Sequence, residues 1–63
     1  MTLDVIVIHE TETETKQWIL NDVYIPNCLE GRKVIREAIS KSFFFIVNSY
    51  PTVYFIDEYQ QRN

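Results

Sequence analysis

A run of five apolar residues at positions 43–47, FFFIV, constrains the fold of this chain more than any other feature. Aromatic and β-branched residues are enriched in strands, so we predict a strand over residues 43–48. A strand with one face in water alternates apolar and polar residues, whereas this one offers apolar side chains to both faces. Such a strand needs other elements packed on both of its faces, and a short chain has few elements to provide them.

Three further segments have the composition of strands: residues 3–9, residues 16–25 and residues 52–58. The segment ETETET between the first two is expected to be a loop or the tip of a hairpin. Simple alternation places Trp18, Leu20 and Tyr24 on one face of the second strand. Asn21 and Asp22 tolerate unusual backbone angles, which makes them a candidate bulge. Residues 59–63 are interpreted as a polar tail.

A helix is predicted over residues 27–42. Asn27 is the candidate N-cap, and Glu30 follows three residues later, as in a capping box. Lys41 falls in the last turn, where a cation suits the helix dipole. Gly31 costs about 1 kcal/mol relative to alanine, but its missing side chain would let the helix approach the sheet closely. The stripe at helical spacing consists of Cys28, Ile35, Ala38, Ile39 and Ser42.

The predicted fold class is therefore α+β, with the order β-β-α-β-β in a single domain of residues 1–63. It is a small two-layer domain, with a four-stranded antiparallel sheet and one helix on one face. Four strands span roughly 15–19 Å, whereas one helix is about 10 Å across. The helix would cover part of one sheet face and none of the other.

The uncovered sheet face is the predicted protein interface, because a large apolar patch on a small protein normally marks an interaction site. A homodimer would cover it, since two-fold dimers are the commonest assemblies, and so would a larger protein target. The alternative is that the strands curl until the chain hides both faces itself. The candidate interface residues are Trp18, Leu20, Tyr24, Phe44, Ile46, Tyr54 and Ile56.

Length and composition exclude several classes of function. A chain of 63 residues is only marginally stable alone, and its single cysteine cannot form an internal disulfide. One cysteine and one histidine do not make a zinc site, and no cofactor motif is present. No apolar run reaches the length of a membrane span, and the first residues do not resemble a signal peptide. We expect a cytoplasmic protein, in its own cell or in a host cell.

Catalysis is not expected. His9 and Cys28 are the side chains best suited to it, and neither belongs to a recognisable catalytic motif. We interpret His9 as a strand-end residue and Cys28 as a small apolar residue of the helix.

Two charged segments are candidate contacts for other macromolecules. Glu10, Glu12 and Glu14 would share one side of an extended segment, where a row of carboxylates could imitate a nucleic-acid backbone. The alternative is a solvated loop that keeps an edge strand from aggregating. The helix is rich in bases, and its candidate contacts to nucleic acid are Arg32, Lys33 and Arg36. The net charge of −3 argues against a dedicated nucleic-acid binder.

In size, acidity and lack of catalytic groups, the chain resembles the small cytosolic proteins with which viruses of bacteria block host or defence machinery. The resemblance implies an anti-defence inhibitor. We therefore predict a non-enzymatic protein-interaction module, homodimeric, that acts as a steric inhibitor or adaptor of a larger protein. The alternatives are a dimeric regulator that contacts nucleic acid through the basic helix and an acidic nucleic-acid mimic that uses the Glu/Thr segment.

Overall fold

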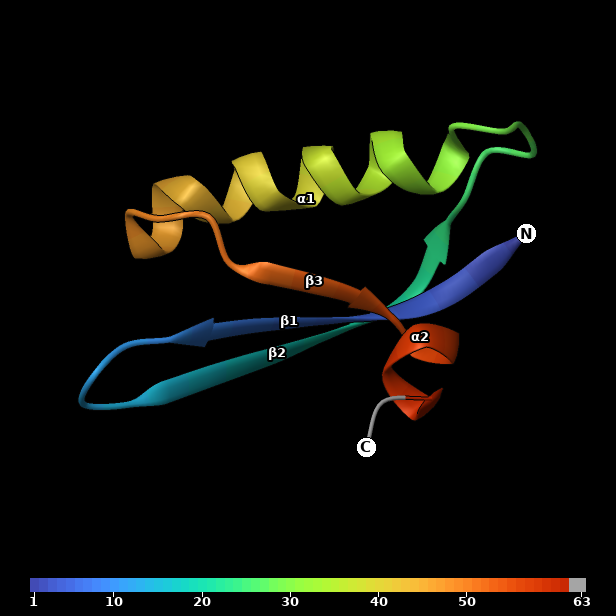
Figure 1. The fold of residues 1–63 in the computed structure, drawn as a ribbon. Helices are drawn as coiled ribbons and strands as arrows, with labels where there is room; N and C mark the ends of the chain where they lie inside the picture. Colours follow the sequence, from blue (N-terminus) through green and yellow to red (C-terminus); the bar gives the residue numbers. More distant parts are fainter. Residues whose placement is uncertain (62–63) are drawn as a thin grey trace.

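A computed structural model describes residues 1–61 and contains three strands and two helices within them. Strand β1 (Thr2–Glu10) and strand β2 (Thr15–Tyr24) form a hairpin, which is followed by helix α1 (Gly31–Val47). Strand β3 (Thr52–Phe55) leads directly into helix α2 (Ile56–Gln61). The fold is α+β, with α1 along one face of the sheet and α2 at one end of the other face (Figure 1).

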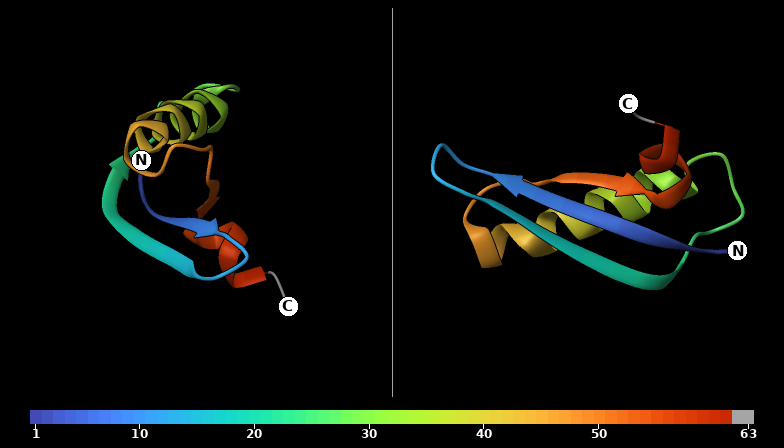
Figure 2. Two further views of the ribbon diagram at one scale, coloured as in Figure 1. Left: turned by 90° about the vertical axis from the view of Figure 1, so that its left-hand side faces the viewer. Right: turned by 90° about the horizontal axis from the view of Figure 1, so that it is seen from below.

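The sheet is antiparallel throughout, with the order β2-β1-β3. Strand β1 is central and pairs with both neighbours, so that Val7 lies between Trp18 of β2 and Val53 of β3. The sheet is strongly curved, and β2 bends toward α1 at its carboxyl end (Figure 2). The hairpin and the antiparallel pairing agree with the sequence-based prediction.

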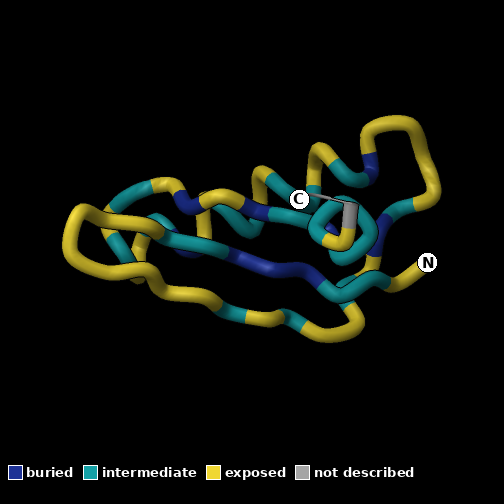
Figure 3. The backbone as a smooth tube through the Cα atoms, turned by 60° about the horizontal axis from the view of Figure 1, so that its bottom comes forward, coloured by how far each residue is buried: buried dark blue, intermediate teal, exposed yellow. Residues whose placement is uncertain are grey.

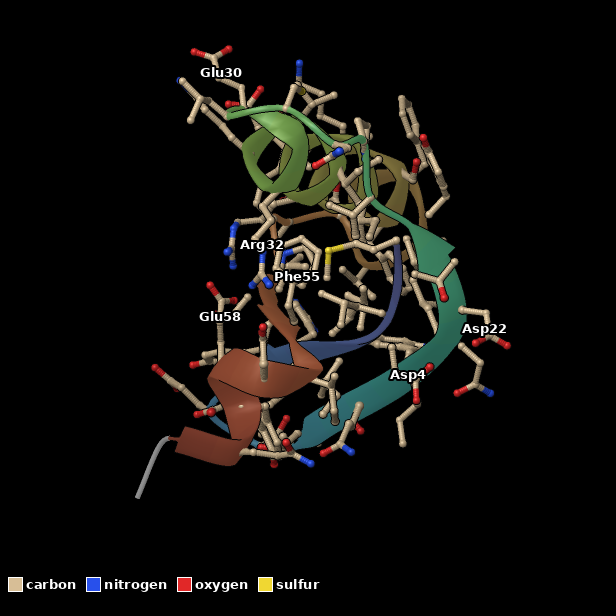
Figure 4. All side chains as sticks on the ribbon, turned by 90° about the vertical axis from the view of Figure 1, so that its right-hand side faces the viewer. Asp4, Asp22, Glu30, Arg32, Phe55 and Glu58 are labelled. Atoms are coloured by element: carbon tan, nitrogen blue, oxygen red, sulfur yellow. The ribbon has the colours of Figure 1, made fainter. Side chains whose placement is uncertain are left out.

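The predicted bulge is present in β2, where the register shifts between Leu3 and Val5 of β1. Asp22 has a φ of 55°, and its backbone N–H donates a 3.0 Å hydrogen bond to Oδ1 of Asp4 (Figure 4). The extra residue reverses the facing of the strand beyond it. Val23 therefore points to the core, and Tyr24 is 64% exposed, so the predicted common face for Trp18, Leu20 and Tyr24 was wrong.

The core lies between the sheet and α1. Val5, Val7 and Phe55 are fully buried, and the ring centroids of Trp18 and Phe43 are 5.0 Å apart in an edge-to-face contact. The longest buried stretch of the tube lies in the middle of β1 (Figure 3), while β2 is intermediate or exposed along its length. A core this small gives a chain of this length only a narrow margin of stability.

The strand predicted over residues 43–48 was wrong, because this segment forms the carboxyl-terminal turns of α1. Ile35, Ile39 and Phe43 stand four residues apart and face the core together, so helical spacing prevails over strand propensity. The helix ends at Asn48, which has a φ of 58° and donates its N–H to the carbonyl of Phe44 at 2.8 Å. A left-handed residue commonly ends a helix, and asparagine sometimes takes this position in place of glycine.

The predicted start of the helix at residue 27 was also wrong. Residues 26–30 form turns, and α1 begins at Gly31 with Glu30 as an N-cap that makes no side-chain capping bond. A side chain at Gly31 would collide with the backbone carbonyl of Pro26, so the close approach is to the preceding turn rather than to the sheet. Cys28 is exposed in this turn, and Lys41 lies in the middle of the helix.

The predicted strand over residues 52–58 continues only to Phe55 and is followed by α2. The N–H of Phe55 donates to Oε1 of Glu58 at 3.1 Å, the contact that a glutamate in the first turn makes with an N-cap residue. Part of the predicted tail, residues 59–61, belongs to α2, and residues 62–63 lie outside the described part of the chain. The sheet therefore has three strands, not four, and two helices pack against it.

Candidate functional site

The seven residues predicted as one interface lie in different places. Trp18 and Leu20 are partly buried on the core face of β2, beneath α1. Tyr24 is exposed beyond the bulge on the opposite face. These three side chains do not form one surface.

Two more of the predicted residues, Tyr54 and Ile56, lie where β3 meets α2. The rings of Tyr54 and Tyr59 are in edge-to-face contact, with centroids 5.7 Å apart. Ile6, which pairs with Tyr54 across the sheet, is buried. Helix α2 thus covers part of the second sheet face, which was predicted to be left uncovered within the chain.

The remaining pair, Phe44 and Ile46, belongs to an aromatic cluster at the carboxyl-terminal end of α1. The ring of Phe44 lies between those of Phe45 and Tyr50, with centroid distances of 6.0 Å and 4.9 Å. Phe45 is 88% exposed, and Ile46 and Tyr50 are each 66% exposed. We call Phe44, Phe45, Ile46 and Tyr50 the aromatic end of α1. Phe45 was not among the predicted interface residues, and helical geometry turns it to solvent.

The outer edge of β3 is closed by side chains, and we call it the capped edge. Arg36 of α1 donates to the carbonyl of Val53 at 2.5 Å and to both carboxylate oxygens of Glu58 at 2.8 Å and 3.0 Å. Glu58 in turn accepts from the N–H of Phe55. The guanidinium of Arg36 also lies 4.9 Å from the centre of the Phe55 ring (Figure 4).

A second arginine extends this arrangement. Arg32 donates two hydrogen bonds to Asp57, at 3.0 Å and 2.6 Å, and its guanidinium lies 5.1 Å from the centre of the Phe55 ring. These bonds lower the pKa of Asp57, although burial opposes them. Burial raises the pKa of Glu58, but the hydrogen bonds from Arg36 and from the Phe55 N–H outweigh it, so that pKa is also lowered.

The predicted basic face of α1 is changed by these pairs. Arg32 and Arg36 point their charges at Asp57 and Glu58, which leaves Lys33 as the exposed base among the three predicted contacts. Paired guanidinium groups contribute less to phosphate binding than free ones, because each is already neutralised.

The predicted row of carboxylates is interrupted by the hairpin tip. Glu10 ends β1, whereas Glu12 lies in the turn that joins the strands. The hydroxyl of Thr11 accepts from the backbone N–H of Glu14 at 3.1 Å, which holds the tip in a tight turn. Glu14 itself pairs with Lys16 at 3.6 Å. The acidic residues therefore do not form a straight series.

His9 makes a contact that the sequence did not predict. Its Nε2 lies 2.6 Å from Oγ of Ser49, beside a cavity of about 320 Å³ that Glu10 and Tyr50 also line. Among residues 1–61, no group hydrogen-bonds the other ring nitrogen of His9, as an orienting residue would. The adjacent carboxyl-terminal end of α1 disfavours the negative charge that develops in acyl transfer. We interpret the pair as a tether between β1 and the segment after α1.

Within the described residues, no three acidic, histidine or cysteine side chains gather into a group that could hold a metal ion. No helix there is both long and apolar enough to cross a membrane. Comparisons with known protein families, with curated proteins and with solved structures found no match to this chain.

Proposed function

We propose that this chain is a non-enzymatic protein-interaction module that acts, as a homodimer, as a steric inhibitor or adaptor of a larger protein. The observation that carries this proposal is the aromatic end of α1. Phe45 and Ile46 are among the most exposed apolar side chains of a protein that buries very few. A chain with so small a core is only marginally stable, and an exposed apolar cluster on such a protein normally marks a surface that a partner covers.

The aromatic end has the composition of a binding hot spot. Aromatic side chains combine a large apolar area with few rotatable bonds, and they dominate the energy of many interfaces. Burial of apolar area contributes about 25 cal/mol per Å², so a few such side chains give a substantial driving force. Contact with Phe44 holds Phe45 and Tyr50 in place before binding, which lowers the entropic cost of association.

The surroundings of the aromatic end indicate the chemistry of the partner surface. The hairpin tip, with its glutamates, lies at the same end of the molecule as the carboxyl terminus of α1 (Figure 1). Glu10 and Tyr50 line one cavity there. We therefore propose a target with an apolar groove and basic residues at its rim, which the glutamates would attract during encounter.

The nucleic-acid alternatives have less support. The arginines of α1 are held by Asp57 and Glu58, and the acidic residues of the tip are not arranged in a row. Pairing of the arginines reduces the positive charge available to a phosphate backbone. The scattered acids make a weaker imitation of such a backbone.

Affinity capture with matched variants tests the proposal. The tagged full-length chain is incubated with nuclease-treated lysate, and bound proteins are compared for the unchanged chain, Phe45→Lys and Leu29→Lys. Leu29 is fully exposed in the turn before α1 and serves as the control for an added charge. We expect a specific protein that Phe45→Lys no longer captures and Leu29→Lys still does, and we expect the captured protein to lose activity or assembly when bound. Capture that depends on nuclease-sensitive material, or that Phe45→Lys leaves unchanged, would overturn the proposal.

A further inference from the structure

The cap on the outer edge of β3 leaves one backbone group without a partner. Arg36 binds the carbonyl of Val53 on the side of β3 that faces away from β1. The N–H and C=O of one residue point to the same side of an antiparallel strand, so the N–H of Val53 also points outward. Among residues 1–61, no acceptor hydrogen-bonds this N–H. Val53 is 4% exposed, and a buried N–H without an acceptor is rare in native proteins.

The next outward residue along β3 supports this orientation. Phe55 turns its N–H to Oε1 of Glu58, which lies on the same outer side. Tyr54 stands between Val53 and Phe55, so the alternation along the strand directs its backbone groups to β1. The cap thus binds the carbonyl of Val53 and the N–H of Phe55, but not the N–H of Val53.

Val53 lines a groove between α1 and the segment that leads into β3. A cavity of about 360 Å³ lies there, which is within the size range of ligand sites. Its lining residues are Arg36, Glu37, Ser40, Pro51, Thr52 and Val53. A smaller cavity of about 140 Å³ adjoins it, because Glu37 and Ser40 line both. Tyr50 lines the smaller cavity, so the two together, which we call the α1–β3 groove, connect the capped edge with the aromatic end of α1.

The α1–β3 groove contains hydrogen-bond donors that are not fully used. Arg36 has five N–H donors and makes three hydrogen bonds, to Val53 and Glu58. The hydroxyl of Ser40 has no hydrogen-bond partner within residues 1–61. Together with the N–H of Val53, these donors suit a ligand group that carries two acceptor oxygens, as a carboxylate does.

The position of Arg36 limits how another chain can lie along this edge. A strand that continued past Val53 would pair with both its N–H and its C=O. The guanidinium of Arg36 already occupies the carbonyl, so a chain that accepts from the N–H has to end at this point. The group that ends a chain is a carboxylate. In the opposite direction the groove continues toward Tyr50, which leaves space for the residues that precede the terminus.

From the unbound N–H and the blocked edge, we infer that the α1–β3 groove binds the carboxyl-terminal end of an extended segment of a partner protein. The terminal carboxylate accepts from the N–H of Val53 beside the guanidinium of Arg36, and the preceding residues lie along Ser40 toward Tyr50. The segment runs parallel to β3, which also leads away from the carboxyl-terminal end of α1 (Figure 1). Addition of an extended segment to a strand edge is a recurring mode of peptide recognition. This site goes beyond the proposed function, because it does not use Phe45.

Two charged side chains of the groove affect the expected affinity. Glu37 lines both cavities and repels a carboxylate, whereas Lys41 lines the smaller cavity and attracts one. Glu58 also neutralises part of the charge of Arg36. We therefore expect a free peptide to bind weakly and to bind more tightly when Glu37 loses its charge.

Nuclear magnetic resonance with short peptides tests the inference. The isotope-labelled full chain is titrated with acetyl-Ala-Ala-Val, whose apolar terminal residue suits Pro51 and Val53, and the amide resonance of Val53 is followed. The same peptide with an amidated carboxyl terminus and the acetate ion are the comparison probes. We expect the free acid to shift the Val53 resonance to saturation, and we expect both other probes to bind about tenfold more weakly or less.

Matched variants test the roles of individual side chains. Glu37→Gln should strengthen binding of the free acid by about threefold and leave binding of the amide unchanged. Ser40→Ala should weaken binding of the free acid by about threefold. Ser42→Ala, on the exposed side of α1, is its control and should change nothing. Arg36 is left unchanged in these variants, because it also holds α2 through Glu58.

Several results would overturn the inference. A Val53 resonance that none of the probes moves would show that the groove binds no peptide terminus. Equal affinity for the acid and the amide would exclude the carboxylate, and equal affinity for acetate would reduce the site to one for simple anions. Weaker binding of the acid in Glu37→Gln would contradict the assigned charge of the ligand. These measurements do not involve the larger target, so peptide binding can fail while capture through Phe45 succeeds, and the reverse.

Discussion

The two edges of this small sheet differ in what happens to their outward-facing backbone groups. Side chains bind such groups at the β3 edge, whereas the β2 edge is open. The β3 edge has four residues, and Arg36 and Glu58 bind two of its outward backbone groups. The β2 edge has ten residues and only solvent on its outer side within the described chain. The charged groups that close the first edge also hold α1 and α2 against it. One edge therefore contributes to the stability of the monomer, whereas the other is available for association.

The charged side chains at the two edges differ in whether they support the core. Arg32 and Arg36 stack on the fully buried Phe55 and reach acids of α2, so their charges support the core. Lys16 and Asp22 lie along the β2 edge, and within residues 1–61 neither side chain forms an ion pair with α1 or α2. Substitutions at the two edges should consequently affect different measurements.

Phe55→Ala should have the largest effect. Phe55 is fully buried beneath both arginines, and truncation of a buried phenylalanine costs about 3–5 kcal/mol. That loss approaches the whole stability of a domain of this size, so we expect circular dichroism to show a largely unfolded chain. Trp18→Ala on the open-edge strand removes a half-buried ring and should be tolerated better in urea unfolding. Equal losses at the two positions would contradict the assignment of stability to the capped edge.

Arg36→Ala should have an intermediate effect. It leaves the carbonyl of Val53 and the carboxylate of Glu58 without their donor and removes a cation from the Phe55 ring. Because the Arg36 side chain is partly exposed, water compensates some of the loss, and we expect about 1–2 kcal/mol in urea unfolding. The matched control is Lys16→Ala, which should change the free energy of unfolding by less than about 0.5 kcal/mol. If Lys16→Ala lowered the free energy of unfolding as much as Arg36→Ala, the β2 edge would also stabilise the monomer.

Acidification should have the smallest effect, and we expect it to act through the two carboxylates of the capped edge. The pKa values of Asp57 and Glu58 are lowered in the folded state from ordinary values of 3.8 and 4.5. A lowered pKa gives stability that is present above the unfolded value and is lost as the pH falls through the folded one. Unfolding free energy should therefore be level above about pH 4.5 and decline below it.

Glu58→Gln removes one of these two carboxylates and is the control for acidification. Its stability should be lower near neutral pH and should fall less steeply below pH 4.5 than that of the unchanged chain. An identical acid slope in both proteins would mean that other carboxylates govern the decline.

Local signals were sufficient for the amino-terminal half of the fold. The β-branched residues of β1 and β2, with the Glu/Thr turn between them, predict a hairpin, and Asn21-Asp22 predicts its bulge. A hairpin is formed by neighbours in sequence, so its signals lie within the segment that folds. The consequence of the bulge for Tyr24 was not foreseen, because alternation was continued through it.

The carboxyl-terminal half was harder to predict, and two signals were available there. Asn48 followed three residues later by Pro51 is typical of the end of a helix, and Ile35, Ile39 and Phe43 continue its apolar face. The strand propensity of residues 43–47 was given more weight than these two signals, so the helix was ended too early. For the candidate site, Phe44 and Ile46 were identified, but Phe45 and Tyr50 were not, since strand and helical geometry direct adjacent residues differently.

The sequence by itself determined that this chain is α+β, has an antiparallel hairpin and a helix, and lacks the cysteines and histidines for a covalent or metal staple. The tertiary structure decided how the helix and the edges are used. Long-range contacts selected helix over strand for residues 43–47, because Phe43 gains burial only on the face of α1 that meets the sheet. They also brought Arg36 to Val53 and Glu58, far apart in sequence, which closed one edge and left the other open.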